Sequence, residues 1–200
     1  MKTLIVFNHP YGGSYCASIM AAVENGLDKS SQPYKTINLD QEEFDPVMRS
    51  KDLIAFAGAG RTGEEALAVV DEMVIRYKGM LEWAEHLVMI FPIWWMTMPA
   101  MTKGFIDKVI FPAIAYTMED GRLKSRLPLE RVTIITTMNT PAEAYRDMFN
   151  NALEGSLING TFKKIGIEDV RWISLNEVRQ ASDELRKSWL THIEETFARR

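Results

Sequence analysis

The stretch HLVMIFPIWWMTMPAMTKGFIDKVI, residues 86–110, decides the fold. It opens with a continuous apolar run, then breaks at a proline into two adjacent tryptophans, Trp94 and Trp95. A helix can begin at Pro99, because proline at the first helical position loses no hydrogen bond. Apolar residues then recur at helical spacing through residues 101–110. We therefore predict a buried strand, a short aromatic loop and an amphipathic helix.

Four further strands are predicted outside this stretch, and helical patterns separate them. The strands are expected at residues 3–7, 34–39, 132–137 and 170–175, and the helices at residues 15–27, 62–83, 139–162 and 183–197. The strand at residues 3–7 is continuously apolar rather than alternating, which is typical of a parallel sheet buried on both faces, whereas the more polar strand at 34–39 suits a sheet edge. The alternation predicts an α/β fold: a doubly wound sheet of five parallel strands, order 2-1-3-4-5, with helices on both faces.

The remaining segments are more polar or more ambiguous. Residues 116–128 contain an Asp-Gly turn signal and are predicted to form a small hairpin. Residues 40–51 read as a loop, and the short apolar run at 53–57 has no clear assignment. The helical region at 139–162 is expected to be interrupted near Gly155 and Gly160.

Composition and charge narrow the class of protein. The 200 residues suggest one domain, and a net charge of −4 gives no sign of nucleic-acid binding. One cysteine excludes an internal disulfide and fits a reducing compartment. The N-terminal apolar run is too short for a signal peptide, and no stretch is long enough to span a membrane. These features predict a soluble, cytoplasmic protein without membrane insertion.

Ligands of open α/β sheets bind beyond the carboxyl ends of the strands, so the loops there are candidate sites. The first loop, HPYGGSY at residues 9–15, joins a strand to a helix for which Ser14 is a plausible N-cap. Helix N-termini bind phosphate readily, and the two glycines let the backbone approach a ligand. Phosphate binding is the favoured interpretation, although glycines in such turns can serve geometry alone.

Two other loops at the same edge complete the predicted site. Trp94 and Trp95 can flank a flat ligand, but packing against the core explains them equally well. The third loop carries hydroxyls and an amide without charge, at residues 136–140, and can bind a heterocycle. Helix capping is an equally good account of Thr140. Together the three loops suit a flat, phosphorylated heterocycle, and a flavin is the obvious choice.

Other motifs are weaker. Residues 58–63, GAGRTG, match G-x-G-x-x-G but lack the acidic residue expected about 20 positions on, so we interpret them as a flexible loop before a helix. The three histidines show no metal spacing, and no metal site is predicted. Cys16 lies at a helix start, where a thiolate would be stabilised, but without a known base we interpret it as a packing residue rather than a nucleophile.

Three motifs resemble one family over most of the chain. They are FPIWWMTMPAMTKGFIDKV at residues 91–109, NHPYGGSYCASI at residues 8–19 and LDQEEFDPVM at residues 39–48. They are similar to the NAD(P)H:quinone oxidoreductases of the flavodoxin-like superfamily, the DT-diaphorase and bacterial drug-activity-modulator group. The resemblance implies that residues 1–200 form a single flavodoxin-like flavin-binding domain.

The resemblance also implies the residues that bind the cofactor. These are His9, Ser14, Tyr15 and Cys16 on the phosphate side, Pro92, Ile93, Trp94 and Trp95 along the isoalloxazine, and Thr136 and Thr137 near its polar edge. Met138 and Asn139 replace a Gly-Gly pair of the family in the same loop. FAD is slightly favoured over FMN. Tyr145 lies near, but not at, the spacing of a family tyrosine and is a candidate catalytic hydroxyl donor.

Family members are homodimers with the site at the subunit interface, and NAD(P)H is their co-substrate. The implied reaction passes hydride from NAD(P)H to flavin and then, after the nicotinamide leaves, to a quinone-like acceptor in a ping-pong cycle. Two alternatives remain. A flavodoxin-type one-electron carrier would usually be shorter and more acidic than this chain. A regulatory flavoprotein subunit would need a partner surface that the sequence does not reveal.

Overall fold

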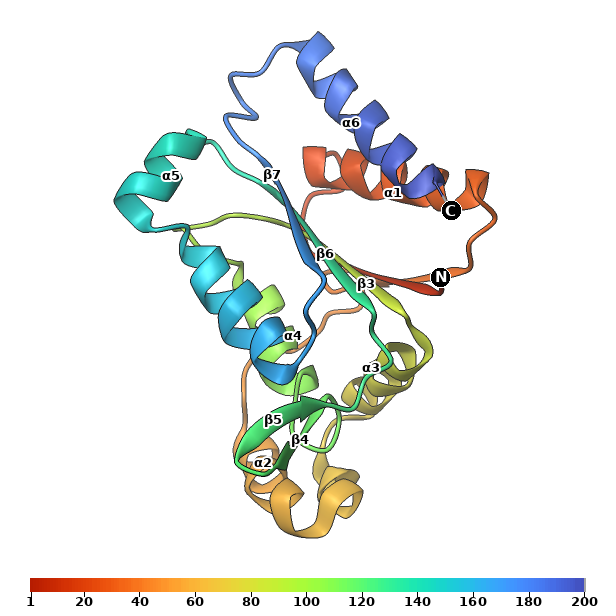
Figure 1. Ribbon diagram of the computed structural model, residues 1–200, viewed down its shortest axis with the longest axis vertical. Coiled ribbons are helices and arrows are strands. Elements are labelled where there is room, and N and C mark those ends of the chain that lie inside the picture. The colour runs from red at the N-terminus through yellow and green to blue at the C-terminus, as the bar shows by residue number, and fades with distance from the viewer. Residues whose placement is uncertain (200) are drawn as a thin grey trace.

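The structure is a computed structural model that describes residues 1–199, with the backbone alone at positions 60–62 and 64. The main sheet has five parallel strands in the order β2-β1-β3-β6-β7 (Figure 1). These strands are Thr3–Phe7 (β1), Tyr34–Asn38 (β2), His86–Pro92 (β3), Arg131–Thr137 (β6) and Val170–Leu175 (β7). The strand numbers differ from the predicted 2-1-3-4-5 because β4 and β5 form a separate hairpin between β3 and β6.

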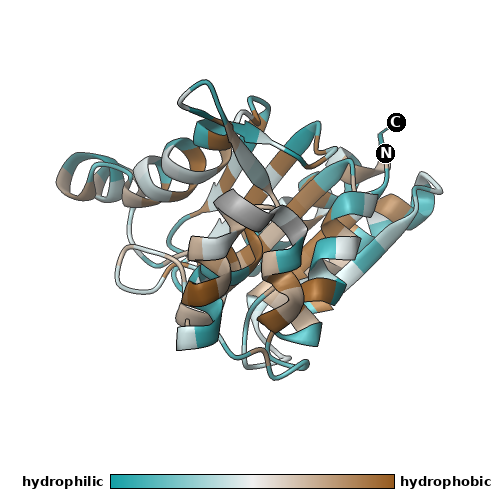
Figure 2. Ribbon diagram, turned by 90° about the horizontal axis from the view of Figure 1, so that it is seen from below, coloured by the Kyte–Doolittle hydropathy of each residue, from teal (hydrophilic) through white to brown (hydrophobic). Residues whose placement is uncertain are grey.

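Helices cover both faces of the sheet, as predicted. On one face, α1 (Tyr15–Lys29) and α6 (Asp183–Ala198) pack side by side, while α3 (Glu72–Trp83) and α4 (Ala100–Val109) cover the other face (Figure 1). All seven residues of β3 are buried, which explains its continuous apolar run. Hydrophobic residues accordingly concentrate on the strands in the middle of the molecule (Figure 2).

The polar segment between β3 and β6 forms the predicted hairpin. Its strands are Tyr116–Glu119 (β4) and Arg122–Ser125 (β5), which pair antiparallel. The turn residues Asp120 and Gly121 both have positive φ angles, of 50° and 74°. Two-residue hairpin loops of type I′ require such angles, and Asp-Gly adopts them readily.

The helix predicted at residues 62–83 is wrong, because three elements replace it. They are α2 (Ser50–Thr62), a 3₁₀ segment (Gly63–Val69, η1) and α3. Gly63 ends α2 with a φ of 59°, and Asp71 precedes α3 in an extended conformation. The G-x-G-x-x-G match therefore spans the end of a helix, not a flexible loop and not the strand-to-helix turn of a dinucleotide site.

The region after β6 also differs from its prediction. Helix α5 (Ala142–Phe149) ends at Asn150 and Asn151, which have left-handed φ angles of 49° and 46°. A π-helical segment (Glu154–Phe162, η2) and a short 3₁₀ turn (Lys163–Ile165, η3) follow. The interruption therefore lies at two asparagines, which tolerate the left-handed region, and not at the glycines inside η2.

A buried lysine joins the sheet-covering helices to the 40–49 loop. Lys108 of α4 is 2% exposed, and its Nζ lies 3.7 Å from Oδ2 of Asp52 and 3.3 Å from Oδ2 of Asp71. The same ammonium donates to the backbone carbonyls of Asp45 at 3.1 Å and Val47 at 3.4 Å. These contacts connect α4 to the start of α2, the start of α3 and the loop.

Candidate functional site

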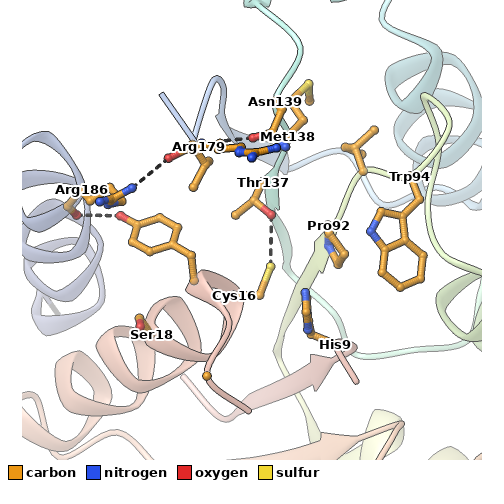
Figure 3. Close-up of a pocket in the computed structure, with 14 residues that line it drawn as sticks. His9, Cys16, Ser18, Pro92, Trp94, Thr137, Met138, Asn139, Arg179 and Arg186 are labelled. Carbon is orange, nitrogen blue, oxygen red and sulfur yellow. Dashed lines mark hydrogen bonds between the residues drawn. The ribbon is translucent and has the colours of Figure 1, made fainter. Parts of the chain in front are cut away.

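A cavity of about 480 Å³ lies beyond the carboxyl ends of β1, β3, β6 and β7 (Figure 3). It is lined by His9, Gly13, Tyr15, Cys16, Ser18, Pro92, Ile93, Trp94, Thr137, Met138, Asn139, Val178, Arg179 and Arg186. The strand order changes direction between β1 and β3, and the cavity lies next to this point. Open α/β sheets bind ligands at such a topological switch point. The volume falls within the range of small-molecule sites.

The N-terminus of α1 presents free backbone amides to one end of the cavity. Ser14 is the N-cap, and its Oγ accepts the N–H of Ala17 at 3.2 Å. Among the described residues, the backbone N–H groups of Gly13, Tyr15 and Cys16 have no hydrogen-bond partner. Such amides at a helix N-terminus bind phosphate oxygens. The Ser14 side chain caps the helix, as predicted, but does not line the cavity.

An aromatic wall faces this helix end. Trp94 lines the cavity, and its ring meets His9 edge-on with the centroids 6.3 Å apart. Nδ1 of His9 accepts the N–H of Tyr11 at 3.1 Å, which fixes the imidazole. Ile93 donates its N–H to Thr137 O at 2.8 Å, so the chain stays paired with β6 as it leaves β3. The wall is thus built on the end of the sheet.

The tryptophan pair splits, because the chain turns sharply after Trp94. Trp94 and Thr97 exchange two backbone hydrogen bonds, of 2.9 and 3.1 Å, around a two-residue turn. Both central residues, Trp95 and Met96, have positive φ angles, of 48° and 63°, which non-glycine residues rarely adopt. Trp95 is 96% exposed and does not line the cavity, so only Trp94 of the two tryptophans faces it.

Tyr145 supports this turn from behind rather than facing the cavity. Its buried hydroxyl donates to Met96 O at 2.8 Å and accepts the N–H of Leu153 at 3.1 Å. Its ring packs edge-on against Trp172. Burial raises the pKa of the Tyr145 hydroxyl. Tyr145 is not among the lining residues, and its hydroxyl is bonded to the turn that follows Trp94.

Replacing Tyr145 with phenylalanine is expected to destabilise the protein by about 1–3 kcal/mol, because a buried carbonyl and a buried amide lose their partner. The turn should also hold Trp94 less firmly. Urea unfolding measures the loss of stability, and flavin titration measures the effect on binding next to Trp94. Tyr11→Phe, at an exposed tyrosine, is the matched control. A variant with unchanged stability but lost turnover would instead make Tyr145 catalytic.

The two threonines at the end of β6 point in opposite directions. Thr137 lines the cavity, with its Oγ1 3.2 Å from Sγ of Cys16. Thr136 is fully buried, and its Oγ1 accepts the indole N–H of Trp172 at 2.9 Å. Successive side chains of a strand alternate between faces, so only one of the two predicted threonines can reach the ligand.

Cys16 lies in the cavity wall as a protonated thiol. Burial raises the pKa of Cys16 to about 11, and the hydrogen bond with Thr137 only partly opposes this effect. This environment agrees with the prediction that Cys16 is a packing residue and not a nucleophile.

A fourth loop, after β7, and the first turn of α6 bring two arginines that the sequence analysis missed, Arg179 and Arg186. Met138 accepts the N–H of Val178 at 3.2 Å, and Oδ1 of Asn139 accepts the N–H of Arg179 at 3.1 Å. The Arg186 guanidinium donates to Val178 O and pairs with Asp183. The exposed guanidinium of Arg179 has no partner among the described residues, so it is available to an anion.

A family model described as having a flavodoxin-like fold matches residues 1–196. The chain belongs to the flavodoxin-like fold family. A crystal structure of the Smu.1420 protein from Streptococcus mutans superposes on this member of the family with a TM-score of 0.84, at 30% identity, over 99% of each chain.

Curated relatives of this flavodoxin-like chain are oxidoreductases by name. It is 26% identical over 196 residues to an uncharacterized NAD(P)H oxidoreductase of Haemophilus influenzae, covering 95% of this chain and 91% of the relative. It is also 25% identical over 124 residues to an FMN-dependent NADH:quinone oxidoreductase of Ruegeria pomeroyi, covering 60% and 59%. These similarities confirm the predicted family resemblance, and the chain is an NAD(P)H dehydrogenase (quinone)-like flavodoxin-fold enzyme.

Two further observations concern metals and membranes. Among the described side chains, which leave out positions 60–62, 64 and 200, no three His, Cys, Asp or Glu gather in a way that would bind a metal ion. None of the described helices combines the length and the apolarity needed to cross a bilayer.

Proposed function

We propose that residues 1–200 act as one flavin-binding domain that reduces quinone-like small molecules with NAD(P)H, by two-electron hydride transfer in a ping-pong cycle. One observation carries the proposal: free amides at the start of α1 and the Trp94 wall face the same cavity. This combination suits a phosphate joined to a flat ring. The name of the Ruegeria pomeroyi relative favours FMN, so we revise the earlier preference for FAD.

The protein's own residues would bind and orient the flavin, whose ring system supplies the redox chemistry when bound. The amides of Gly13, Tyr15 and Cys16, together with the guanidinium of Arg179, suit its phosphate. Trp94 would then cover one side of the isoalloxazine beside Pro92, Ile93 and His9. Hydrogen bonds to the polar edge would come from Thr137 and Asn139, and Cys16 would exclude water.

The direct test is a visible spectrum of the purified protein after FMN or FAD is added, followed by anaerobic addition of NADH or NADPH and then of menadione. A flavin spectrum that is bleached without a semiquinone band, and restored by the quinone, is the expected result. A protein that binds flavin but ignores both nucleotides, or stops at a stable semiquinone, would be a one-electron carrier. Failure to bind either flavin would overturn the proposal.

Replacing Ser18 with glutamate tests the phosphate end of the site. Ser18 lies in the first turn of α1, is exposed and lines the cavity. The new carboxylate should weaken FMN binding about 10- to 100-fold, because like charges at close range repel by roughly 1–3 kcal/mol. The helix itself should not be destabilised, since an acidic residue favours a helix N-terminus.

Ser18→Gln is the matched control, because it has the same length without the charge. Flavin fluorescence quenching measures the FMN affinity of both variants. Lumiflavin lacks the phosphate, so its affinity should depend on the shape of the new side chain and not on its charge. Equal FMN affinity of the two variants would place the phosphate elsewhere.

We also propose that the protein is a homodimer, because helix α2 carries an exposed apolar patch. Leu53, Ile54 and Phe56 are large hydrophobic residues exposed on this helix, which is unusual for a free surface. The exposed Trp95 beside the cavity fits a site at the subunit interface. Sedimentation equilibrium is expected to give a dimer that Ile54→Lys weakens, and a monomeric parent protein would remove the proposal.

A further inference from the structure

A second cavity, of about 610 Å³, lies at the amino ends of β3, β6 and β7, at the sheet edge opposite the flavin site. The carboxyl-terminal parts of α1 and α6 close it from the side. Its lining includes His86, Arg131, Thr133, Arg171, Phe197 and Arg199. The volume is in the range of small-molecule sites, and the proposed flavin function makes no use of it.

The inner surface of this cavity is polar on a sheet face that is otherwise apolar. Nε2 of His86 lies 2.8 Å from Oγ1 of Thr133, and both side chains are buried. Thr3, in register with His86 on the neighbouring strand, does not line the cavity but is buried as well. Its Oγ1 has no hydrogen-bond partner among the described residues. Buried polar groups are unfavourable unless paired, so this end of the sheet is built for more than packing.

Two largely buried aromatic rings line the cavity next to these polar groups. His86 stacks on Phe197 with the planes 8° apart and the centroids separated by 5.8 Å. Burial and the charges of Arg131 and Arg171 lower the pKa of His86 to about 4, against the smaller opposing effect of Asp169. The imidazole is therefore neutral at pH 7, and Nε2 is committed to Thr133.

The rim of the cavity carries excess positive charge. Arg131, Arg171 and Arg199 line it, and none of the described lining residues has a carboxylate side chain. Arg131 and Arg171 share the single carboxylate of Asp169, with Nε–Oδ distances of 2.7 and 2.9 Å. The Nη groups of Arg131 have no partner among the described residues. Guanidinium groups with free N–H groups bind oxyanions well.

We propose that this cavity binds a small organic oxyanion, a carboxylate or a phosphate monoester with a flat apolar body. The oxyanion would lie against Arg131 and Arg171, and the flat body against the His86–Phe197 pair. Binding would offset the arginine charges that His86 experiences, so the ring itself would report occupancy. The site is separate from the flavin cavity and does not depend on the proposed function.

The chain's three histidines make the test specific, because His86 reports this cavity and His9 reports the other. We would titrate the protein with benzoate, phenyl phosphate and inorganic phosphate, and follow the histidine Cε1–H signals by NMR. The expected result is a saturable shift of the His86 signal with at least one aromatic anion, while His9 and His192 stay unchanged. The comparison of benzoate with phenyl phosphate identifies the preferred head group.

Arg171→Gln is expected to weaken this binding at least about 10-fold, the effect of losing one charge-assisted hydrogen bond. Arg122→Gln, on the exposed hairpin, is the matched control and should bind normally. Absence of any His86 shift, or an unchanged affinity in Arg171→Gln, would overturn the site. Equal affinities for inorganic and phenyl phosphate would overturn recognition of the flat body.

Discussion

Replacing Lys108 with methionine is expected to destabilise the fold by about 3–5 kcal/mol, the usual cost of removing one partner of a buried ion pair. Methionine can fill most of the space, but it leaves the carboxylate of Asp52, itself 2% exposed, without the nearby positive charge. Two backbone carbonyls of the 40–49 loop also lose a donor. Chemical unfolding in urea measures the loss, and a thermal midpoint lower by roughly 10 °C should accompany it.

The control is Lys103→Met in the same helix. Lys103 pairs with Asp107 four residues later, but both side chains are substantially exposed. Pairs of this kind contribute only about 0.3–0.5 kcal/mol. If Lys108→Met is as stable as the control, the buried cluster does not hold α2 and the loop in place. The double variant Lys108→Met with Asp52→Asn should recover part of the loss, because it removes the unpaired charge.

The second large effect expected is an acid-dependent loss of stability caused by His86. Its pKa is lowered from 6.5 to about 4 in the folded protein. When the pH is below the pKa that His86 has in the unfolded chain, the unfolded chain binds a proton that the folded chain does not. Acid therefore favours unfolding. The stabilisation is complete above pH 6.5 and declines as the pH falls towards about 4. The full stabilisation is about 3 kcal/mol, because each unit of difference between the folded and unfolded pKa corresponds to about 1.4 kcal/mol.

Urea unfolding at several pH values between 7 and 4 measures this dependence. Carboxylates titrate in part of the same range, so the informative quantity is the difference between the parent protein and His86→Gln. Glutamine can keep the contact with Thr133 but carries no titrating group. The parent protein should lose stability faster than the variant as the pH falls. Parallel stability curves would contradict the lowered pKa of His86.

The sequence predicted the sheet well because burial on both faces leaves a strong signal. The continuous apolar runs of β1, β3 and β6 mark central strands, and their order follows from the handedness of the crossovers. Helix α2 gave no such signal. Its apolar residues Leu53, Ile54 and Phe56 face outward, and its glycines resemble a loop, so no one-sided stripe was visible.

The structure brings the predicted loops together around one cavity, but only some of their predicted side chains line it. Neighbours such as Thr136 and Thr137, or Trp94 and Trp95, look equivalent in a sequence, but strand alternation and a tight turn send them in different directions. Arg179 could have been found by applying the same rule to the last strand, and Arg186 by following the chain into the helix after that loop. Its carboxyl end lies beside that of β6, and the loop that follows was not considered.

The sheet order also determines how this protein should acquire its binding capacity during folding. The central pair β1–β3 joins Thr3 to His86, and the next pair joins β3 to a strand that begins at Arg131. Contacts between such distant parts of a chain form slowly, because loop entropy is lost before pairing compensates for it. All four loops around the flavin cavity depend on these pairings. A refolding chain should therefore gain helical circular dichroism first and bind flavin only in its final kinetic phase.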